Sequence, residues 1–389
     1  MRVRSVLSLV FFALLFALPQ SSNAATLVVG NNPAVCPSAQ YATIQAGVNA
    51  AATGETIEVC PGTYPEQVTI TKSVTIAGDN GAIVMPGPVS GNATDVASGT
   101  PIAAIILVQG ATDVTIDGLI VDGSNNGLTQ CSPVLIGILY ENASGSITHN
   151  AVRSMSTPSV SGCQGGDAIV VLTGSGQSST VDIAANSVHD YQKNGITGDE
   201  AGTTVTIHDN TVTESAPATG AAPNGVQIGF GAAGKINGNT VSGNIWAPCV
   251  SVSNCSAAGT GILIYESDSV TVKDNSVGTN QFGIAVEGNK AKIDNNSVYN
   301  SLVLDGIVLM GNDNEATSNT ITHSDQAAVA IQGNDNTVQN NTITDALVGI
   351  FTVSGSSGNT ISDNTFHDTV TKKADPASPL APAVPGPAR

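Results

Sequence analysis

Polar and apolar positions alternate in a phrase that recurs along most of the chain. An asparagine is followed by a small or hydroxyl residue and then by an apolar one. In the C-terminal half these asparagines are 21 to 23 residues apart, and upstream the spacing stretches to as much as 36. A repeat of about 22 residues with insertions predicts one structural unit per repeat, with loops of variable length. The nine asparagines are Asn150, Asn186, Asn210, Asn239, Asn275, Asn296, Asn319, Asn341 and Asn364.

A second phrase, a small residue followed by a short apolar run, precedes each of these asparagines. The runs are rich in β-branched residues and are bounded by Gly, Asn and Asp, which is typical of strands between tight turns. Alternation within them, as in Ile284 to Glu287, sends one side chain inward and the next outward. The nine runs begin at Ile138, Ile169, Ile196, Val226, Ile262, Ile284, Ile307, Val329 and Ile350.

Together the two phrases predict an all-β protein, a single right-handed parallel β-helix covering residues 25–371 with Val, Ile and Leu stacked inside. Asparagines repeated at one point of every coil have a structural explanation. They tolerate left-handed backbone angles, and side chains stacked at the strand spacing of about 4.8 Å form a hydrogen-bonded ladder. We therefore assign none of the nine a catalytic role.

The N-terminal segment resembles the opening of the pectin-lyase-like β-helix superfamily. Residues Tyr41–Ala51 look like its amphipathic capping helix, which covers the exposed edge of the first coil. Gly54–Val59 and Pro61–Glu66 are similar to the strand and turn that open pectin methylesterases. The resemblance implies the fold over nearly the whole mature chain. It does not extend to activity, because the catalytic phrases of the methylesterases, polygalacturonases and mannuronan epimerases are missing.

Both ends of the chain read as segments outside the β-helix. Arg2 and Arg4, the apolar stretch Val6–Leu18 and the small residues Ser22–Ala24 predict a signal peptide over residues 1–24. The mature protein is then secreted, extracellular or periplasmic, without a transmembrane segment, because the apolar stretch is short of the ~20 residues that span a bilayer. Residues 372–389 are rich in Pro and Ala and predict a disordered tail.

Charge and cysteine content narrow the class of partner. The net charge is −18, and removing the two N-terminal arginines from the 12 basic residues leaves ten against 30 acidic ones. Such an excess of negative charge repels nucleic acid. Six cysteines in an exported chain are expected to pair, and we favour pairs between neighbours along the sequence: Cys36–Cys60, Cys131–Cys163 and Cys249–Cys255. We expect a monomer.

Loop lengths place a candidate site over the coil that contains Ile196. The connection from each asparagine to the next apolar run spans 10 residues before Ile196, but 19 before Ile169, 16 before Val226 and 23 before Ile262. A short loop between long ones predicts a floor between two walls, where functional residues concentrate. One outward row reads Leu139, Val170, Thr197, Gln227, Leu263, Ala285, Val308, Ala330 and Phe351, in which only Thr197 and Gln227 are polar.

Further polar residues surround this window. Asp199 lies two residues beyond Thr197, Lys193, Asn194 and Glu200 flank the strand, and Asp167 and Asn224 hold the position of Asn194 in the neighbouring coils. Trp246, in the longest loop, is a candidate contact at the rim, and packing of that loop against the helix is an equal alternative. We expect Lys193 and Asp199 to face solvent. The alternative interpretation of the whole set is a solvated patch with a lysine in a turn.

In the functional interpretation each residue type has a role. Lys193 neutralises a uronate or accepts its proton, and Asp199 and Glu200 serve as an acid or as cation ligands, for which Ca²⁺ is the candidate. Sugar hydroxyls are hydrogen-bonded by Asn194, Thr197, Asn224 and Gln227. Two functions from different classes follow. One is a carbohydrate-active, lyase-like or glycan-binding protein for an acidic polysaccharide or cell-surface glycan, and the other is a non-catalytic surface or periplasmic scaffold.

Overall fold

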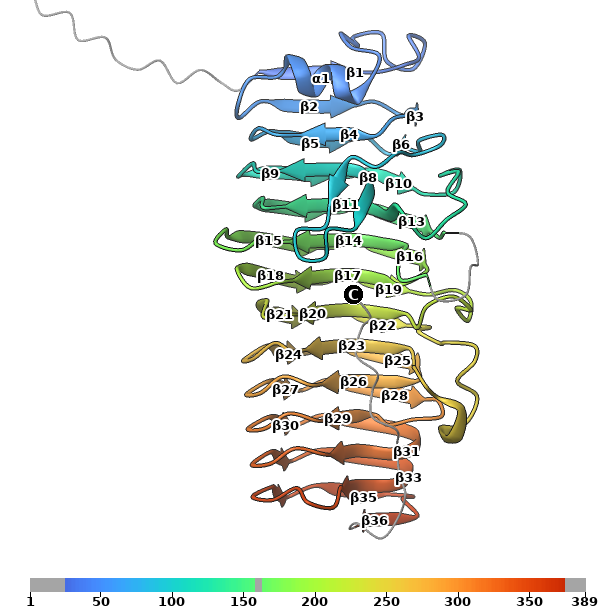
Figure 1. Ribbon diagram of the computed structural model, residues 1–389, viewed down its shortest axis with the longest axis vertical. Helices are drawn as coiled ribbons and strands as arrows, with labels where there is room; N and C mark the ends of the chain where they lie inside the picture. Colours follow the sequence, from blue (N-terminus) through green and yellow to red (C-terminus); the bar gives the residue numbers. More distant parts are fainter. Residues whose placement is uncertain (1–24, 158–162, 375–389) are drawn as a thin grey trace, which may run out of the picture.

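The chain winds into a stack of coils whose strands run side by side from the first coil to the last (Figure 1). The computed structural model describes residues 25–157 and 163–374. Each coil contributes up to three strands, and corresponding strands of successive coils pair in parallel. The strands therefore form three long parallel faces, called faces A, B and C below, and the right-handed parallel β-helix predicted from the repeat is confirmed.

Face A is a continuous parallel sheet of 13 strands. Its strands are short, and the outward positions are mostly polar while the inward ones are Val or Ile. In chain order they are β1 (Thr26–Val29), β2 (Thr56–Val59), β5 (Thr75–Gly78), β9 (Val114–Asp117), β12 (Gly145–Thr148), β15 (Ser179–Ala184), β18 (Thr203–His208), β21 (Ala233–Asn237), β24 (Thr271–Lys273), β27 (Lys292–Asp294), β30 (Glu315–Thr317), β32 (Thr337–Gln339) and β34 (Thr360–Ser362).

Face B follows face A in each coil, across the turn that carries the repeated asparagine. Two long strands, β31 and β33, continue from face B into face C without a break. The strands of face B are β3 (Gly62–Tyr64), β6 (Ala82–Val84), β10 (Ile120–Asp122), β13 (Ala151–Met155), β16 (Ser187–Tyr191), β19 (Thr211–Thr213), β22 (Thr240–Ser242), β25 (Ser276–Asn280), β28 (Ser297–Ser301), β35 (Thr365–His367) and the first parts of β31 (Thr320–Ile331) and β33 (Thr342–Thr352).

Face C carries the apolar runs, and its last strand ends at Ala374, three residues beyond residue 371. The connections from face B to face C vary most in length. The strands of face C are β4 (Val68–Ile70), β8 (Pro101–Gln109), β11 (Val134–Glu141), β14 (Asp167–Leu172), β17 (Asn194–Asp199), β20 (Asn224–Gly229), β23 (Thr260–Tyr265), β26 (Phe282–Val286), β29 (Ile307–Leu309), β36 (Thr371–Ala374) and the second parts of β31 and β33.

One apolar core runs the length of the stack. Ile169, Ile196 and Val226 pair in register on face C and are fully buried. Burying an Ile or Val side chain contributes about 1.5–3 kcal/mol relative to exposing it, so a column of such residues through every coil supplies most of the driving force for folding. Inward aromatic residues are few, and Tyr140 and Tyr191 are among the largest fully buried side chains.

The nine repeated asparagines form the predicted ladder at the turn between faces A and B. The backbone N–H of each donates to the side-chain oxygen of the next at 2.9–3.0 Å, from Asn150 through to Asn364. Our explanation that these asparagines occupy left-handed backbone positions was wrong, because none of the nine adopts a positive φ. The left-handed angle falls on the residue before each asparagine: His149, Ala185, Asp209, Gly238, Asp274, Asn295, Ser318, Asn340 and Asp363.

A short helix closes the N-terminal end of the stack, as the sequence predicts (Figure 1). Helix α1 (Ile44–Ala50) is shorter than the expected Tyr41–Ala51, with Thr43 as its N-cap. The carboxylate of Glu66 accepts hydrogen bonds from the backbone N–H groups of Ile44 and Gln45 at 2.7 and 2.9 Å. A carboxylate at this end of a helix satisfies N–H groups that have no partner within it.

One segment departs from the repeat and crosses the outside of face C. Between β6 and β8 the chain leaves the coil, and β7 (Ala93–Thr94) returns antiparallel to β8. We call residues 85–100 the strap. Beneath it lies an outer apolar cluster that includes Ile102, Leu107 and Leu139. The strap thus converts part of the outer surface of face C into a second buried layer.

Three disulfides tie loops to the stack, and they are the pairs favoured from the sequence. Cys36–Cys60 links the first two coils, Cys131–Cys163 joins two loops beside face C, and Cys249–Cys255 closes a loop that contains a 3-10 turn, Val252–Asn254. Within residues 25–157 and 163–374, no helix is long and apolar enough to cross a membrane. The predicted signal peptide and residues 375–389 of the predicted tail lie outside the described residues.

Candidate functional site

The register of face C places the outward residues in the row derived from the repeat. Val170, Thr197 and Gln227 are successive partners on β14, β17 and β20, and the row continues to Leu263 on β23. Further along it pairs Ala285, Val308, Ala330 and Phe351. The change from polar to apolar along this row is therefore a change between equivalent positions of neighbouring coils.

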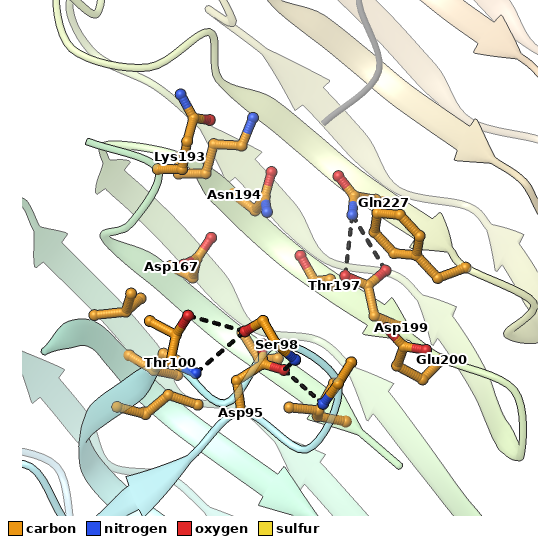
Figure 2. Close-up of a pocket in the computed structure, with 18 of the residues that line it drawn as sticks. Asp95, Ser98, Thr100, Asp167, Lys193, Asn194, Thr197, Asp199, Glu200 and Gln227 are labelled. Carbon is orange, nitrogen blue, oxygen red and sulfur yellow. Dashed lines mark hydrogen bonds between the residues drawn. The ribbon is translucent and has the colours of Figure 1, made fainter. Parts of the chain in front are cut away.

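A cavity of about 400 Å³ lies on the outside of face C over β14, β17 and β20. Its polar lining comes from β14 and β17 with their flanking residues, from Gln227 on β20 and from the strap (Figure 2). Pockets of 300–1,000 Å³ are typical of sites for small ligands. Seven of the nine candidate site residues from the sequence line the cavity: Asp167, Lys193, Asn194, Thr197, Asp199, Glu200 and Gln227.

Lys193 lies inside this cavity and does not face bulk solvent, so our expectation for it was wrong. Its exposed fraction is 6%, and its Nζ donates to the backbone oxygen of Ala222 at 3.2 Å. Burial lowers the pKa of Lys193 to about 8, against the opposing charges of Asp167 and Asp199. A buried lysine with a lowered pKa retains a proton that it can release close to neutral pH.

Two aspartates share the cavity with this lysine. Burial raises the pKa of Asp167 to about 7, although the charge of Lys193 and hydrogen bonds from Asn194 act in the opposite direction. The pKa of Asp199 also rises to about 7, first through burial and then through the charges of Glu200, Asp167 and Asp95, while a hydrogen bond from Gln227 lowers it. Asp199 is partly exposed, so our expectation of a solvent-facing side chain holds only in part.

Hydrogen bonds join the polar residues of β17 and β20 into one network. Gln227 Nε2 donates to both carboxylate oxygens of Asp199 at 3.1 Å (Figure 2). Asn224 Nδ2 donates to Asn194 Oδ1 at 3.1 Å and to Gln227 Oε1 at 3.2 Å. Asn224 is therefore placed behind Asn194 and Gln227 and is not part of the cavity lining, so it positions these two side chains.

Two buried oxygens of the cavity have no hydrogen-bond partner among the described residues. They are Asp167 Oδ1 and Thr197 Oγ1, on side chains whose residues are 7% and 2% exposed. Leaving a buried polar atom without a partner costs roughly 1–3 kcal/mol, and such atoms in native proteins call for an explanation. Because both residues line the cavity, a polar ligand that enters it would supply the missing partners.

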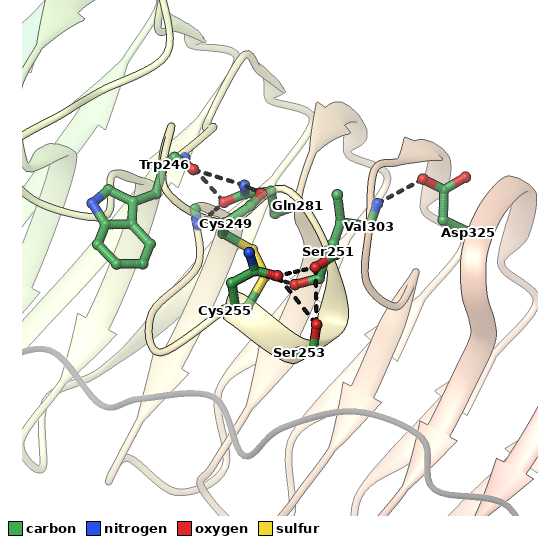
Figure 3. Close-up of a disulfide and its surroundings, with 10 residues drawn as sticks. Trp246, Cys249, Ser251, Ser253, Cys255, Gln281, Val303 and Asp325 are labelled. Atoms are coloured by element: carbon green, nitrogen blue, oxygen red, sulfur yellow. Dashed lines mark hydrogen bonds between the residues drawn. A yellow bond between two sulfur atoms is a disulfide. The ribbon is translucent and has the colours of Figure 1, made fainter.

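Trp246 does not line the cavity, in contrast to its expected place at the rim. It packs against a separate outer apolar cluster that contains Cys249, Cys255 and Leu263. Its backbone is held by Gln281, which accepts from the Trp246 N–H at 3.0 Å and donates to its carbonyl at 2.9 Å. Figure 3 shows the indole ring directed away from the Cys249–Cys255 disulfide. The residue therefore anchors the longest loop.

The sequence analysis missed the residues that the strap contributes. Asp95, Ser98 and Thr100 form one wall of the cavity opposite β17 (Figure 2). The Asp95 carboxylate accepts from the backbone N–H groups of Ala97 and Ser98 at 2.8 Å, which fixes the turn of the strap. Residues 85–100 precede the first repeat phrase, which begins at Ile138, so the repeat gave no signal for this wall.

A second hollow of about 410 Å³ lies beyond the ends of β13 and β16 and is lined by Asp190, Gln192 and Glu214. Burial raises the pKa of Glu214 to about 7, while bonds from Ser215 and His189 help to lower the pKa of Asp190. Asp190 Oδ2 is thus engaged by the neighbouring His189 at 2.6 Å. None of the candidate site residues predicted from the sequence lines this hollow.

The described residues, 25–157 and 163–374, contain no group of three or more His, Cys, Asp or Glu side chains arranged to hold a metal ion. In the cavity the carboxylates instead lie on different walls, with Asp167 on β14, Asp199 and Glu200 at the end of β17 and Asp95 on the strap (Figure 2). The arrangement presents carboxylates, amides, hydroxyls and one amine to a ligand of small size.

These observations define a class: a parallel β-helix protein with a polar cavity on the outer side of one face. The chain belongs to the right-handed β-helix region family, which it matches over residues 103–303, more than half of its length. Residues 249–378 are also similar to the periplasmic copper-binding protein NosD family. A search of curated protein sequences gave no match.

Solved structures share this fold at low sequence identity. The lacto-N-biosidase of Eubacterium ramulus, of family GH136, is 11% identical with a TM-score of 0.62, covering 88% of this chain and 68% of that one. The surface adhesin PfbA of Streptococcus pneumoniae is 13% identical with a TM-score of 0.56, covering 85% and 88%. An exopolygalacturonase from Thermotoga maritima is 11% identical with a TM-score of 0.54, covering 81% and 84%. These similarities show the fold alone.

Proposed function

We propose that this chain is an exported protein that binds a glycan in the cavity over β14, β17 and β20. The observation that carries the proposal is the pair of buried, unpartnered oxygens, Asp167 Oδ1 and Thr197 Oγ1, in a cavity of about 400 Å³. Sugar hydroxyls both donate and accept hydrogen bonds, so one saccharide unit can satisfy a carboxylate and a hydroxyl together. Three disulfides and the similarity to a periplasmic family support an extracellular or periplasmic location.

The charges of the cavity argue against the acidic polysaccharide expected from the sequence. Four carboxylates line it, on Asp95, Asp167, Asp199 and Glu200, against the single amine of Lys193. A polyuronate would bring further negative charge into a site where carboxylates already repel one another. We therefore propose that the bound glycan carries no carboxylate group at this position. Lyase-like action on an acidic polysaccharide is the weaker alternative.

The buried titratable groups also allow chemistry. Asp167 and Asp199, each with a pKa of about 7, can hold or release a proton near neutral pH, as a general acid or base must. Glycosidases use carboxyl groups in this way as a pair within about 10 Å of each other. Asp167 and Asp199 lie five positions apart along the paired strands, so each would act singly and not as such a pair. Hydrolysis of neutral oligosaccharides is therefore the second property to test, after binding.

The only indication of copper binding is the name of the NosD family, which matches residues 249–378. The cavity lies outside that segment, and the described residues contain no cluster suited to a metal ion. A scaffold function, the alternative from the sequence analysis, is supported by the apolar outer row from Leu263 to Phe351. It gives no reason for the unpartnered oxygens of the cavity.

The test compares two matched threonine variants on a panel of neutral and acidic oligosaccharides. Thr197→Val removes the unpartnered hydroxyl while keeping the size of the side chain, and it should weaken glycan binding about tenfold, the effect of roughly 1.4 kcal/mol. Thr206→Val, on β18 of the same coil but exposed on face A, is the control and should bind as the wild type does.

Calorimetry measures the binding, and reducing-sugar release together with ultraviolet absorbance of unsaturated uronates measures hydrolysis and elimination. Loss of binding in Thr197→Val alone supports the site. Equal binding by both variants moves the glycan site elsewhere, and a panel with neither binding nor turnover leaves the scaffold function.

A further inference from the structure

We infer that the glycan held by this cavity carries a free amino group, so that the ligand is an amino sugar with a protonated amine. The inference rests on the proposed function and specifies its substrate class. The geometry that supports it is an excess of carboxylates on three separate elements around one cavity, combined with polar atoms on its floor that suit sugar hydroxyls.

The carboxylates are distributed unevenly with respect to the lysine. Lys193 and Asn194 lie at one end of the cavity, on the side of Asp167, whereas Asp199 and Glu200 lie at the other end with Asp95 across from them (Figure 2). Among the lining residues that the structure describes, Lys193 is the sole cationic side chain. The carboxylates of Asp95 and Asp199 therefore create a negative potential at this end, which a cationic group of the ligand would neutralise.

A metal ion does not fit this arrangement as well as an organic cation does. Ca²⁺ takes six to eight oxygen ligands at 2.3–2.6 Å, which requires carboxylates that converge on one point. No group of three His, Cys, Asp or Glu within residues 25–157 and 163–374 converges in this way. An ammonium group on a sugar ring needs only one or two acceptors and carries hydroxyls for the remaining polar atoms.

The floor and walls supply those further contacts. Thr197 Oγ1 and Asp167 Oδ1 lack partners, and Asn194 and Gln227 present amides beside them. The wall between these groups is apolar, formed by side chains that include Val170, Leu172 and Phe230. A pyranose ring has polar edges and two apolar faces, so a cavity with polar ends and an apolar wall matches its surface.

The charge around Asp199 predicts how binding depends on pH. Burial raises the pKa of Asp199 to about 7, with the charges of Glu200, Asp167 and Asp95 and against the hydrogen bond from Gln227. Protonated Asp199 carries no charge to attract an ammonium group. Affinity for an amino sugar should therefore be greatest near pH 7, because Asp199 gains its charge as pH rises and the amine of the sugar loses its proton over the same range.

The experiment compares three trisaccharides by calorimetry at low salt and about pH 7, where the sugar amine and Asp199 are each partly charged. They are glucosamine, N-acetylglucosamine and galacturonate trimers. We expect the glucosamine trimer to bind at least about tenfold more tightly than its acetylated form, a difference of roughly 1.4 kcal/mol. Asp199→Asn should abolish this preference, while Asp113→Asn, at an exposed turn before β9, removes the same charge outside the cavity and should retain it.

Circular dichroism and thermal unfolding check that both variants fold, and the wild-type comparison requires no variant. Equal affinity for the glucosamine and acetylated trimers, or a preference that survives Asp199→Asn, contradicts the inference and leaves the proposed glycan site intact. Tightest binding of the galacturonate trimer contradicts it as well. If no saccharide binds, both the inference and the proposed function fail.

Discussion

The asparagine ladder and the floor of the cavity both contain buried polar side chains, but the hydrogen bonding of these side chains differs between the two regions. In the ladder, Asn239 Nδ2 donates to Asn275 Oδ1 at 3.0 Å and to the carbonyl of Ile207 at 2.9 Å, while its own Oδ1 accepts from Asn210. On the cavity floor, Thr197 Oγ1 and Asp167 Oδ1 have no partner among the described residues.

Burial and polarity alone thus do not separate structural from functional residues in a β-helix. A ladder asparagine completes its hydrogen bonds with the coils before and after it, so these hydrogen bonds stabilise the fold. A cavity residue whose buried oxygen lacks a hydrogen-bond partner lowers the stability of the folded protein until a ligand binds, as is common at functional sites. Removing a ladder asparagine should accordingly lower stability, whereas replacing the ionisable Asp199 of the cavity should raise it.

The largest effect is expected from breaking the ladder in its middle. Asn239→Ala removes the acceptor for the Asn210 N–H and Nδ2 groups, which lie at 3.0 Å, and leaves these donors buried. We expect unfolding to become easier by about 3 kcal/mol, the cost of unsatisfied buried donors plus the lost bonds of the amide. Urea unfolding followed by circular dichroism measures the change.

Asn237→Ala is the matched control, because Asn237 is exposed two residues earlier on β21 and should change stability by less than about 0.5 kcal/mol. Equal effects of the two substitutions would contradict a stabilising role for the ladder.

A smaller loss of stability is expected from Lys193→Met. The substitution keeps the apolar stem but removes the cation beside Asp167, so this buried carboxylate loses its counter-charge. At about pH 7.5 Asp167 is largely ionised, and we expect a loss of about 2 kcal/mol. Near pH 5 Asp167 is protonated while Lys193 remains a buried cation, so the loss should vanish.

Lys292→Met provides the comparison, since Lys292 forms an exposed ion pair with Glu315 at 4.0 Å that should contribute little. Urea midpoints at both pH values give the result. A loss at pH 5 as large as at pH 7.5 would show that packing, not charge, is what Lys193 contributes.

The smallest predicted effect has the opposite sign. The pKa of Asp199 is raised in the folded protein, so folding favours its protonated form, and the wild type loses stability as pH rises from about 4 to about 7. Asp199→Asn cannot ionise and keeps an acceptor for Gln227. The shift of about three pKa units corresponds to at most about 4 kcal/mol, and because Asp199 is partly exposed we expect the variant to be more stable than the wild type by only about 1 kcal/mol at about pH 8. At pH 4 the two should be equal.

Thermal unfolding across this pH range tests the prediction, with Asp113→Asn as the control that should follow the wild-type curve. A wild type that gains stability between pH 4 and pH 7 relative to Asp199→Asn would reverse the sign and contradict the raised pKa. Confirmation would show a stability cost for ionised Asp199 in the cavity, as opposed to the gain from the ladder.

Most of the fold followed from the sequence because the repeat is local and each coil obeys the same rule. The spacing of the asparagines aligned Thr197 with Gln227 and Val170, and the pairing of β14, β17 and β20 has this register. Two pairs of neighbouring cysteines, Cys36–Cys60 and Cys131–Cys163, are brought together by successive coils, and Cys249–Cys255 closes a single loop. The left-handed angle was assigned one residue too late, since spacing fixes the period of a turn but not the φ of each residue in it.

Burial at the candidate site could not be derived in the same way. Lys193 belongs to a short loop that reads as exposed, yet its side chain lies in a cavity, 6% exposed. The strap wall with Asp95 comes from a segment about 100 residues earlier that carries no repeat. Contacts between a non-repeating segment and a distant coil leave no periodic signal in a single sequence.

The sequence by itself therefore determined the period, the strands, the ladder and the row of outward positions, because these depend on interactions between one coil and the next. Only the tertiary structure decided which outward positions are buried, which polar atoms lack partners and where Trp246 packs. The reason is physical: strand pairing repeats at every coil, whereas the cavity forms once, where the strap and two loops of unequal length meet face C.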